Sequence, residues 1–328
     1  MKTSLTWHLK LIAIANKQSN LKVIIKYLLL TFALLRTANA MEVAITVDDL
    51  PYFGPYESYT SPEKMNTANA MLEVFKKHKI QGVYGFINGY KVTDDTSRNI
   101  LKLWVDSGQL LGNHTYSHMN ITNHTTHEYT EDINNNEPIL ASMMSSKDYR
   151  YFRYPFLREG NTKDKRDLVR RYLLNNNYKI AEVTLDFWDY EWNAPYARCT
   201  KQNNKEAIEY LKQSYLAASI GAIITAHDLS TMLFKRDIKY IMLIHIGALD
   251  AIMLDQVLSS YEKLGVKFIP LPVALSDKVY SIDSGIVRDT GYTFLNEIRL
   301  SRKLANPKSV TKFYDSIPED KLGKICGE

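Results

Sequence analysis

The sequence contains little cysteine: Cys199 and Cys326 are its only two thiols in 328 residues, and no C-x-x-C pair occurs. A metal or redox site of the C-x-x-C type is therefore excluded. Two cysteines so far apart fit either one disulfide in an exported protein or two free thiols, and the spacing favours neither.

The chain also lacks an excess of positive charge outside its first 40 residues. The formal net charge is +5, from 41 basic and 36 acidic residues. Residues 1–40 hold six basic residues and no acidic ones, so 35 basic and 36 acidic residues remain, a net charge of −1. This balance offers no electrostatic basis for binding nucleic acid.

Internal repeats, low-complexity tracts and linkers rich in proline, glycine and serine are absent from the sequence. Hydrophobic residues make up 45% and charged residues 23%, which is the composition of a globular protein with a sizeable core. We expect one domain over residues 41–280 and a polar C-terminal extension, residues 281–328, whose role the sequence does not indicate.

The first 40 residues have the features of a secretory signal peptide. A basic start precedes the apolar stretch VIIKYLLLTFALL, residues 23–35, and the sequence ANA at residues 38–40. Small residues at Ala38 and Ala40 suit cleavage after Ala40. We therefore expect a periplasmic or secreted protein that begins near Met41 and keeps no membrane span. A retained membrane anchor is the alternative, although the apolar stretch is short and interrupted by Lys26.

Short apolar runs alternate with helical patterns along the rest of the chain. The runs expected to form strands are residues 43–47, 82–87, 109–114, 149–156, 179–185, 240–246 and 266–271. A helix is expected to begin at Ser61-Pro62, with the serine as its cap. Further helices are expected at residues 95–107, 126–144, 163–175, 205–233 and 249–264. This alternation predicts an α/β fold of parallel strands joined by crossover helices.

Two adjacent carboxylates, Asp48 and Asp49, follow the first apolar run in the sequence AITVDDLP. Like charges that are partly buried side by side repel each other, and one of them tends to take a proton. A turn or a helix cap is the common reason for such a pair. A functional pair needs a positive group that holds one carboxylate and a separate task for the other.

A second polar motif, GNHTYSHMN, places His114 and His118 four residues apart. On a helix or helical turn both imidazoles project to one side. With Asp49 they would supply three protein ligands to a divalent metal and leave one position open. The alternative is a solvated face in a His-rich region, since His124 and His127 follow. Both motifs come directly after predicted strands, where α/β barrels build active sites, and this position favours the metal site.

Four motifs in this order resemble the polysaccharide deacetylases, carbohydrate esterase family 4. They are TVDD at 46–49, HTYSH at 114–118, RYPF at 153–156 and DFWDY at 186–190. The resemblance covers about residues 43–272 and implies a distorted (β/α) barrel with seven or eight parallel strands. It also implies one divalent metal, usually Zn²⁺ with Co²⁺, Ni²⁺ or Mn²⁺ open, and removal of N- or O-acetyl groups from a carbohydrate.

Carried onto this sequence, the resemblance implies a role for each residue of the first two motifs. Asp48 would be the general base, and the metal ligands would be Asp49, His114 and His118. The metal would stabilise the adjacent carboxylates, and Asp48 would accept a proton as water attacks the acetyl carbonyl.

The third and fourth motifs imply supporting roles. Arg153 would hold the base through a charged pair, the backbone N–H of Phe156 would help to bind the oxyanion, and Asp189 would tune the catalytic acid. Phe156 stands where the family usually has tyrosine, which is harmless if only the backbone acts. Tyr190 stands where tryptophan is usual, which could reshape the pocket for the acetyl methyl group.

The catalytic acid is expected to be a histidine, because histidine titrates near neutral pH. His227, in ITAHD, superficially resembles the family's last motif, but apolar residues at steps of three and four run through it as one helical face. His245 ends the apolar run YIMLIHI and precedes Gly247, a helix and another strand. This favours His245. For either residue, a core histidine bonded to the backbone is the ordinary alternative.

Together these features predict an exported, metal-dependent carbohydrate deacetylase. An O-acetyl polysaccharide esterase that uses the same residues is the alternative within the enzyme class. A glycan-binding protein that has lost catalysis and a structural metal site are the alternatives outside it. A structural site usually closes with four protein ligands, and only three are found here. The sequence does not indicate which acetylated glycan is the substrate.

Overall fold

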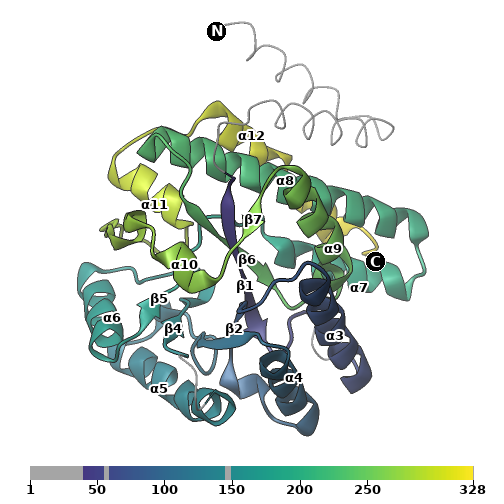
Figure 1. Ribbon diagram of the computed structural model, residues 1–328, viewed down its shortest axis with the longest axis horizontal. Coiled ribbons are helices and arrows are strands. Elements are labelled where there is room, and N and C mark those ends of the chain that lie inside the picture. The colour runs from purple at the N-terminus through teal and green to yellow at the C-terminus, as the bar shows by residue number, and fades with distance from the viewer. Residues whose placement is uncertain (1–39, 55–58, 145–148, 328) are drawn as a thin grey trace, which may run out of the picture.

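The computed structural model describes residues 40–54, 59–144 and 149–327. The predicted signal peptide, apart from Ala40, lies outside the described residues. Figure 1 draws the residues outside this description as a thin grey trace. The expectations of a cleaved leader and of export therefore remain predictions.

Seven parallel strands form one curved sheet in the described part of the chain, in the order β5-β4-β3-β2-β1-β6, with β7 also paired to β1. Their bounds are β1 Glu42–Leu50, β2 Tyr84–Ile87, β3 Leu110–Asn113, β4 Tyr151–Phe152, β5 Lys179–Ile180, β6 Lys239–His245 and β7 Lys267–Phe268.

The sheet closes on itself through the residues that follow β5. The backbone N–H groups of Thr184 and Leu185 donate to the carbonyl of Ile241, and the N–H of Leu243 donates to the carbonyl of Leu185. The β5 segment thereby reaches β6, and the strands form a distorted barrel of the kind the motifs implied. β1 lies between β2 and β6 in this sheet and stands near the middle of the view in Figure 1.

Helices surround the barrel (Figure 1). Their bounds are α3 Ser61–Lys77, α4 Asp95–Asp106, α5 Thr126–Met143, α6 Lys163–Asn175, α7 Asn193–Lys201, α8 Lys205–Phe234, α9 Ala248–Lys263, α10 Leu271–Leu275, α11 Phe294–Ser301, α12 Lys308–Ser316 and α13 Glu319–Lys324. Short 3₁₀ turns lie between them, namely η2 Gly89–Lys91, η3 Ile121–Asn123, η4 Pro155–Leu157, η5 Asp189–Trp192 and η6 Lys278–Ser281.

The first helix begins one residue earlier than the serine cap predicts. Thr60 is the N-cap of α3: its hydroxyl accepts from the N–H of Glu63, while the Glu63 carboxylate accepts from the N–H of Thr60. Ser61 is already helical, and Pro62 lies in the first turn as expected. Serine and threonine can both cap a helix, and the reciprocal bond with Glu63 favours Thr60 here.

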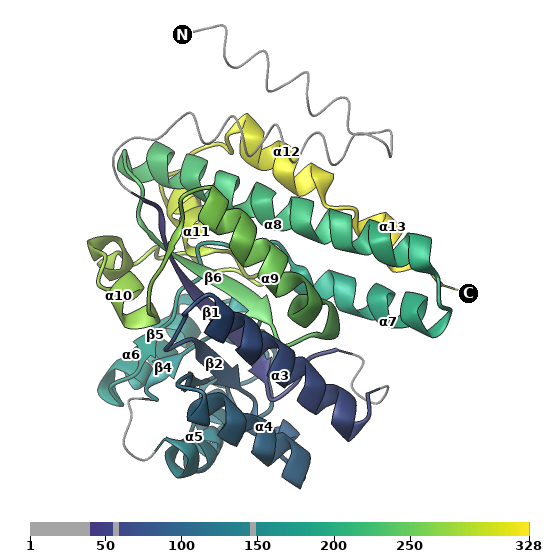
Figure 2. The same cartoon turned by 45° about the vertical axis from the view of Figure 1, so that its right-hand side comes forward.

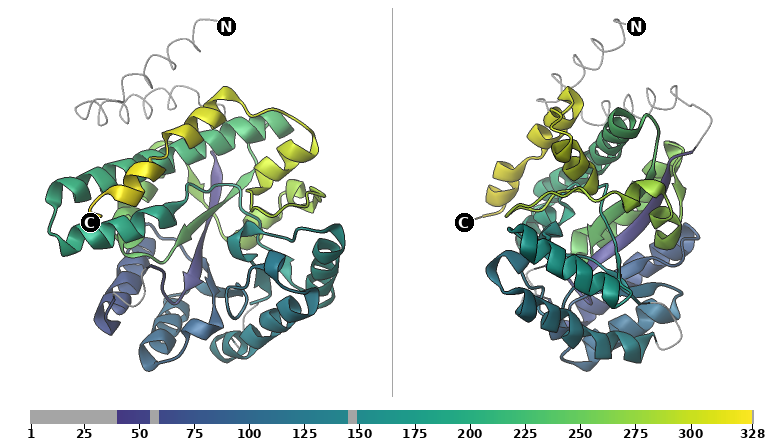
Figure 3. Two further views of the ribbon diagram at one scale, coloured as in Figure 1. Left: turned by 180° about the vertical axis from the view of Figure 1, so that it is seen from behind. Right: turned by 90° about the vertical axis from the view of Figure 1, so that its left-hand side faces the viewer.

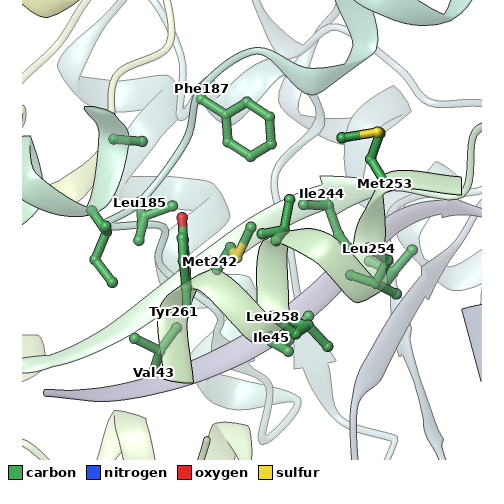
Figure 4. Packing of buried hydrophobic residues seen from close by; sticks show 14 of the residues in the cluster. Val43, Ile45, Leu185, Phe187, Met242, Ile244, Met253, Leu254, Leu258 and Tyr261 are labelled. Carbon is green, nitrogen blue, oxygen red and sulfur yellow. The ribbon is translucent and has the colours of Figure 1, made fainter. Parts of the chain in front are cut away.

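Side chains along the strands alternate between two cores, because successive residues of a strand point to opposite faces. One set packs outward against the helices; Figure 4 shows it between β1, β6 and α9, and its members include Val43, Ile45, Met242, Ile244, Leu254, Leu258 and Tyr261. The other set fills the barrel and includes Ala44, Tyr84, Phe86, Tyr151 and Ile241. This alternation directs Thr46, Asp48 and His245 toward the barrel interior, where the strands end.

The described part of the C-terminal stretch, 281–327, packs into the same core. Its helices α12 and α13 run beside α8 and α7 (Figures 2 and 3). Phe294, Val310 and Phe313 are buried there. A Cβ on Gly221 of α8 would lie 2.6 Å from the Phe313 ring, so glycine permits the close approach of α12.

A disulfide joins Cys199 on α7 to Cys326, with Cα atoms 5.2 Å apart. The sequence left open whether these cysteines form a disulfide or remain two free thiols, and the structure contains the disulfide. Arg198 reinforces this junction by donating to the carbonyls of Leu322 and Ile325. The tail after α13 is therefore held to the body by covalent and polar contacts.

Helix α8 is the one described helix that is long and apolar enough to cross a membrane by composition alone. Its face Leu211, Tyr215, Ala218, Ala222 and Leu229 is buried against the rest of the protein. This is the pattern of a core helix. It also confirms the helical reading of residues 205–233, which contain His227.

Candidate active site

Five polar residues predicted from the sequence meet at the carboxyl ends of the strands. Asp48 and Asp49 lie just before the end of β1, His114 follows β3, Arg153 follows β4 and His245 ends β6. Because the strands are parallel, their carboxyl ends open at one rim of the barrel, and residues far apart in sequence come together there.

Asp49, His114 and His118 form a cluster whose ligand atoms all lie within 4.8 Å of one another. Asp49 Oδ1 is 3.7 Å from His114 Nε2 and 3.5 Å from His118 Nε2. This oxygen is buried and has no hydrogen-bond partner within the protein. A buried carboxylate oxygen without a partner is costly, and one carboxylate with two imidazoles is a donor set suited to a divalent metal. These residues therefore fit the metal that the motifs implied.

The two histidines converge from a loop, so the predicted helix or helical turn at the HxxxH motif is wrong. Residues 114–120 contain no helical turn, and Thr115 and His118 have φ angles of 61° and 56°. The imidazole rings still meet, with centroids 5.0 Å apart. Asn88 supports the loop by donating to the carbonyl of His114 at 2.7 Å, and Asp132 accepts from the N–H of Ser117 at 3.0 Å.

Hydrogen bonding prepares His114 to be a ligand. Its Nδ1 lies 2.7 Å from the carbonyl of Arg153, which can only accept, so Nδ1 carries the proton. Burial and the neighbouring His118 hold the pKa of His114 well below its usual range. The imidazole is therefore neutral, and the lone pair of Nε2 points into the cluster with Asp49.

Lys91, on η2, lies in the site although no pattern in the sequence indicates it. Its Nζ lies 3.6 Å from Asp49 Oδ2, on the other side of the carboxylate from the histidines. Burial alone would raise the pKa of Asp49, but Lys91, His118 and His114 outweigh it and lower that pKa below its usual range. No motif singles out Lys91, because only the fold brings the turn after β2 beside the end of β1.

Asp48 is held by Arg153, as the motifs implied. Arg153 Nη1 lies 3.3 Å from both carboxylate oxygens. The guanidinium is fixed by further bonds, from Nη2 to Thr46 Oγ1 at 2.9 Å and from Nε to the carbonyl of Ala181 at 2.6 Å. Burial raises the pKa of Asp48 to about 6, and Arg153 limits that rise. This pKa lies close to neutrality, where a general base works best.

His245 is paired with Asp189, which is fully buried on η5. The Asp189 carboxylate lies 3.0 Å from His245 Nδ1 and accepts from the His245 backbone N–H at 2.6 Å. Burial favours the neutral ring, but Asp189 outweighs it and raises the pKa of His245 to about 10. The ring is therefore protonated at neutral pH. Phe53 and Tyr190 pack against it with ring centroids at 4.8 and 5.5 Å.

His227 does not reach this rim. It lies on α8, where Nδ1 bonds to Asp237 Oδ1 at 2.7 Å. His124 and His127 also lie outside the cluster, at the start of α5. Of the histidines weighed from the sequence, the structure brings His114, His118 and His245 together.

Phe156 borders the cluster on an exposed turn. Its backbone has a φ angle of 58°, and its ring lies 4.5 Å from that of His118, centroid to centroid. The C-terminal stretch supports this turn: a Cβ on Gly291 would lie 1.8 Å from the carbonyl oxygen of Phe156, so only glycine allows the two backbones to approach so closely. Trp188 likewise packs on Tyr314 of α12, with centroids 5.4 Å apart.

The structure is an α/β barrel of parallel strands with a candidate metal-binding cluster of one aspartate and two histidines at its rim. Residues 36–181 match the family model described as polysaccharide deacetylase, in agreement with the resemblance carried by the four motifs.

Curated relatives are chitin and peptidoglycan deacetylases. The chain is 22% identical over 236 residues to a chitin deacetylase of Arthroderma benhamiae, covering 72% of this chain and 52% of that protein. It is 24% identical over 164 residues to the peptidoglycan N-acetylmuramic acid deacetylase PdaA of Bacillus subtilis, covering 49% of this chain and 54% of that protein. The chain thus spans about half the length of the curated relatives it matches.

Solved structures share the fold. The chitin deacetylase of Colletotrichum lindemuthianum superposes with a TM-score of 0.51 at 17% identity, over 74% of this chain and 91% of that one. The Xyl-CE4 domain of a multidomain xylanase from the hindgut metagenome of Trinervitermes trinervoides gives 0.50 at 14% identity, over 79% and 100%. At this identity the likeness establishes the barrel fold alone.

Proposed function

We propose that this protein is a metal-dependent carbohydrate deacetylase that hydrolyses N-acetyl groups of a polysaccharide or oligosaccharide. The observation that carries the proposal is the convergence at one rim of a three-residue donor set, a carboxylate held by arginine and a protonated histidine. The match to the polysaccharide deacetylase family model supports the same reaction, and the chitin and peptidoglycan deacetylases among the relatives favour an acetylated amino sugar.

Asp49, His114 and His118 would hold the metal, which would supply a Lewis acid to polarise the acetyl carbonyl. Its identity is open, with Zn²⁺ the first expectation and Co²⁺, Ni²⁺ or Mn²⁺ the alternatives. Lys91 would pair with Asp49 Oδ2, which leaves Asp49 Oδ1 directed toward the two imidazoles.

Asp48 would accept the proton of the attacking water, since its pKa of about 6 leaves it mostly ionised at neutral pH. Arg153 would hold its carboxylate in place, and the backbone N–H of Phe156 would donate to the oxygen that becomes negatively charged. His245 would give its proton to the nitrogen as the C–N bond breaks, so that acetate and a free amine leave.

The acid favours an amide over an ester substrate. An amine is a poor leaving group until it is protonated, and Asp189 keeps the proton on His245 at neutral pH. An O-acetyl esterase using the same residues is the alternative, and a glycan-binding protein without activity is the other. Action outside the cytoplasm, after removal of residues 1–40, belongs to the same proposal.

Acetate release from a panel of N-acetylated and O-acetylated glycans, with and without a chelator, tests the proposal. We expect release from N-acetylated chitin-type or peptidoglycan fragments that stops with chelator and returns with Zn²⁺. Release from O-acetylated glycans alone would favour the esterase. Binding without release of acetate from any glycan would favour the inactive binding protein.

A further inference from the structure

A second buried carboxyl group, Asp250, lies behind the Asp189–His245 pair, and the proposed reaction leaves it unused. Asp250 is in the first turn of α9 and has no exposed surface. Tyr215 on α8 donates its hydroxyl to Asp250 Oδ1 at 2.7 Å, and Asn193 on α7 donates its amide to Oδ2 at 2.7 Å. A side-chain hydrogen bond also links Asp250 to Asp189.

Two carboxyl groups in contact inside a protein cannot both be ionised, so they share one negative charge. Asp189 is the carboxyl group of the two that faces His245: it accepts from the His245 backbone N–H at 2.6 Å and lies 3.0 Å from His245 Nδ1. Among the described residues, no lysine, arginine or histidine forms an ion pair with Asp250. Burial and the charge of Asp189 raise the pKa of Asp250 well above its usual range.

We propose that Asp250 is a neutral carboxylic acid that donates a hydrogen bond to Asp189 and acts as a positioning residue for the Asp189–His245 pair. This inference rests on the proposed function, in which His245 is the acid. A neutral donor holds the Asp189 carboxylate toward His245 without adding a second negative charge. His245, Asp189 and Asp250 are thus linked in series by hydrogen bonds, from the rim of the barrel to helix α9.

The packing around Asp250 is built for this contact. A Cβ on Gly247 would lie 2.2 Å from Asp250 Oδ2 and 2.3 Å from Asn193 Oδ1, so only glycine fits there. Asn193 is itself oriented, because its Oδ1 accepts from the N–H of Leu249 at 3.1 Å. An acidic residue in a first helical turn commonly just stabilises the helix dipole from the surface. Asp250 differs from that case because it is enclosed and both of its oxygens are bonded to side chains of other helices.

Carbon-13 NMR of the metal-loaded protein, labelled at the aspartate side-chain carboxyl carbons, tests the protonation state. The resonance that disappears in Asp250→Asn is expected at the position of a protonated carboxylic acid at neutral pH. Asp255→Asn is the matched control on the same helix: Asp255 is at the surface and pairs with Lys77 and His78, so the resonance lost there should be that of a carboxylate. A carboxylate signal for Asp250 would overturn the proposal.

Turnover and its pH profile test the positioning role. Asp250→Asn keeps a neutral group with an N–H donor, so it should retain near-native turnover and an unmoved high-pH limb. Asp250→Leu removes the donor and should lower turnover by roughly 10- to 100-fold, as for a lost hydrogen bond to a charged group. A shift of the limb to lower pH in Asp250→Asn would mean that Asp250 is ionised. Native turnover and pH profile in Asp250→Leu would reduce its role to packing.

The two kinds of readout separate this inference from the proposed function. If the native protein releases no acetate from any glycan, the deacetylase proposal fails, yet the NMR signal of Asp250 still decides its protonation state. If Asp250→Leu does not fold, Asp250→Asn alone carries both measurements. A protonated Asp250 in an active enzyme whose Asn variant has native turnover is the result that supports the inference in full.

Discussion

Asp48 on β1 and His245 on β6 are register partners on adjacent parallel strands. Both side chains point to the barrel interior at the rim, beside the Asp49–His114–His118 cluster. Their surroundings move their affinities for a proton apart: the pKa of Asp48 is raised to about 6 and that of His245 to about 10. Between these values one group is ready to accept a proton and the other to donate one, which is the requirement for paired base and acid.

The first prediction concerns the metal. A His114→Ala/His118→Ala variant should lose the bound divalent ion, because one carboxylate remains of three ligands. His124→Ala/His127→Ala is the matched control, since both histidines lie in the same region but outside the cluster. Elemental analysis of the purified proteins measures the outcome. Equal metal content in the native protein and the His114/His118 variant would rule out this site.

The adjacent carboxylates should respond differently to substitution. Asp48→Asn should keep the metal but lower turnover by roughly 10²–10⁴-fold, because an amide cannot accept the proton. Asp49→Ala should weaken metal binding itself. Metal titration and acetate release, measured on both variants, separate the two effects. Near-native turnover of Asp48→Asn would contradict the assignment of base and ligand.

His245→Ala should lose turnover by roughly 10²–10⁴-fold while the metal stays bound, because the leaving amine then lacks an acid. His227→Ala is the control: it should cost stability through its bond to Asp237, with turnover per folded molecule little changed. Rates are compared after correction for the folded fraction. An inactive His227→Ala together with an active His245→Ala would reverse the assignment of the acid.

The pH profile of turnover should be bell-shaped. Its low-pH limb reports protonation of Asp48, and its high-pH limb reports loss of the proton from His245. Since Asp189 raises the pKa of His245, Asp189→Asn should move the high-pH limb to lower pH. The positive charge of a bound metal would shift both limbs downward, so the comparison is made between variants with equal metal content. Glu191→Gln, on the same turn, should leave the limb in place, and an unmoved limb in Asp189→Asn would refute the pairing.

The disulfide should contribute to stability, because it closes a loop of 127 residues and ties the tail to α7. Cys199→Ser/Cys326→Ser should lower the free energy of unfolding by about 2–5 kcal/mol. Urea denaturation with and without reductant measures this. Reductant should destabilise the native protein and leave the variant unaffected, and a native protein insensitive to reductant would argue against a structural role.

Long elements were predictable from local pattern. Helix α6 has the expected bounds, 163–175, and α8 differs from its prediction by one residue, because caps and apolar periodicity are local signals. The short strands were predicted too long: β4 is Tyr151–Phe152 within 149–156, and β5 is Lys179–Ile180 within 179–185. Strand propensity identifies residues that suit a sheet, but a segment becomes a strand only where it is hydrogen-bonded to an adjacent strand.

The residues with direct roles in the candidate site were predictable from the sequence, but the residues that contact and position them were not. Apolar runs that end in Asp48-Asp49 and His245 indicate strand ends, so these residues followed from the sequence. The helical reading of the HxxxH motif was wrong. Two histidines four residues apart can converge on one side of a helix, but they can also converge from a loop with positive φ angles, and the spacing in the sequence is the same in both cases. Lys91 and Asp250 carry no motif, and both act through residues distant in sequence.

By itself, the sequence determined which side chains of a strand share one face, since alternation along a strand depends only on residue order. It also determined the helices and the donor types at the strand ends. Only the tertiary structure decided that Cys199 pairs with Cys326, that Gly291 supports Phe156 and that Asp250 stands behind Asp189. These contacts join segments far apart in the chain, and their partners are chosen by the packing of the whole barrel rather than by any local pattern.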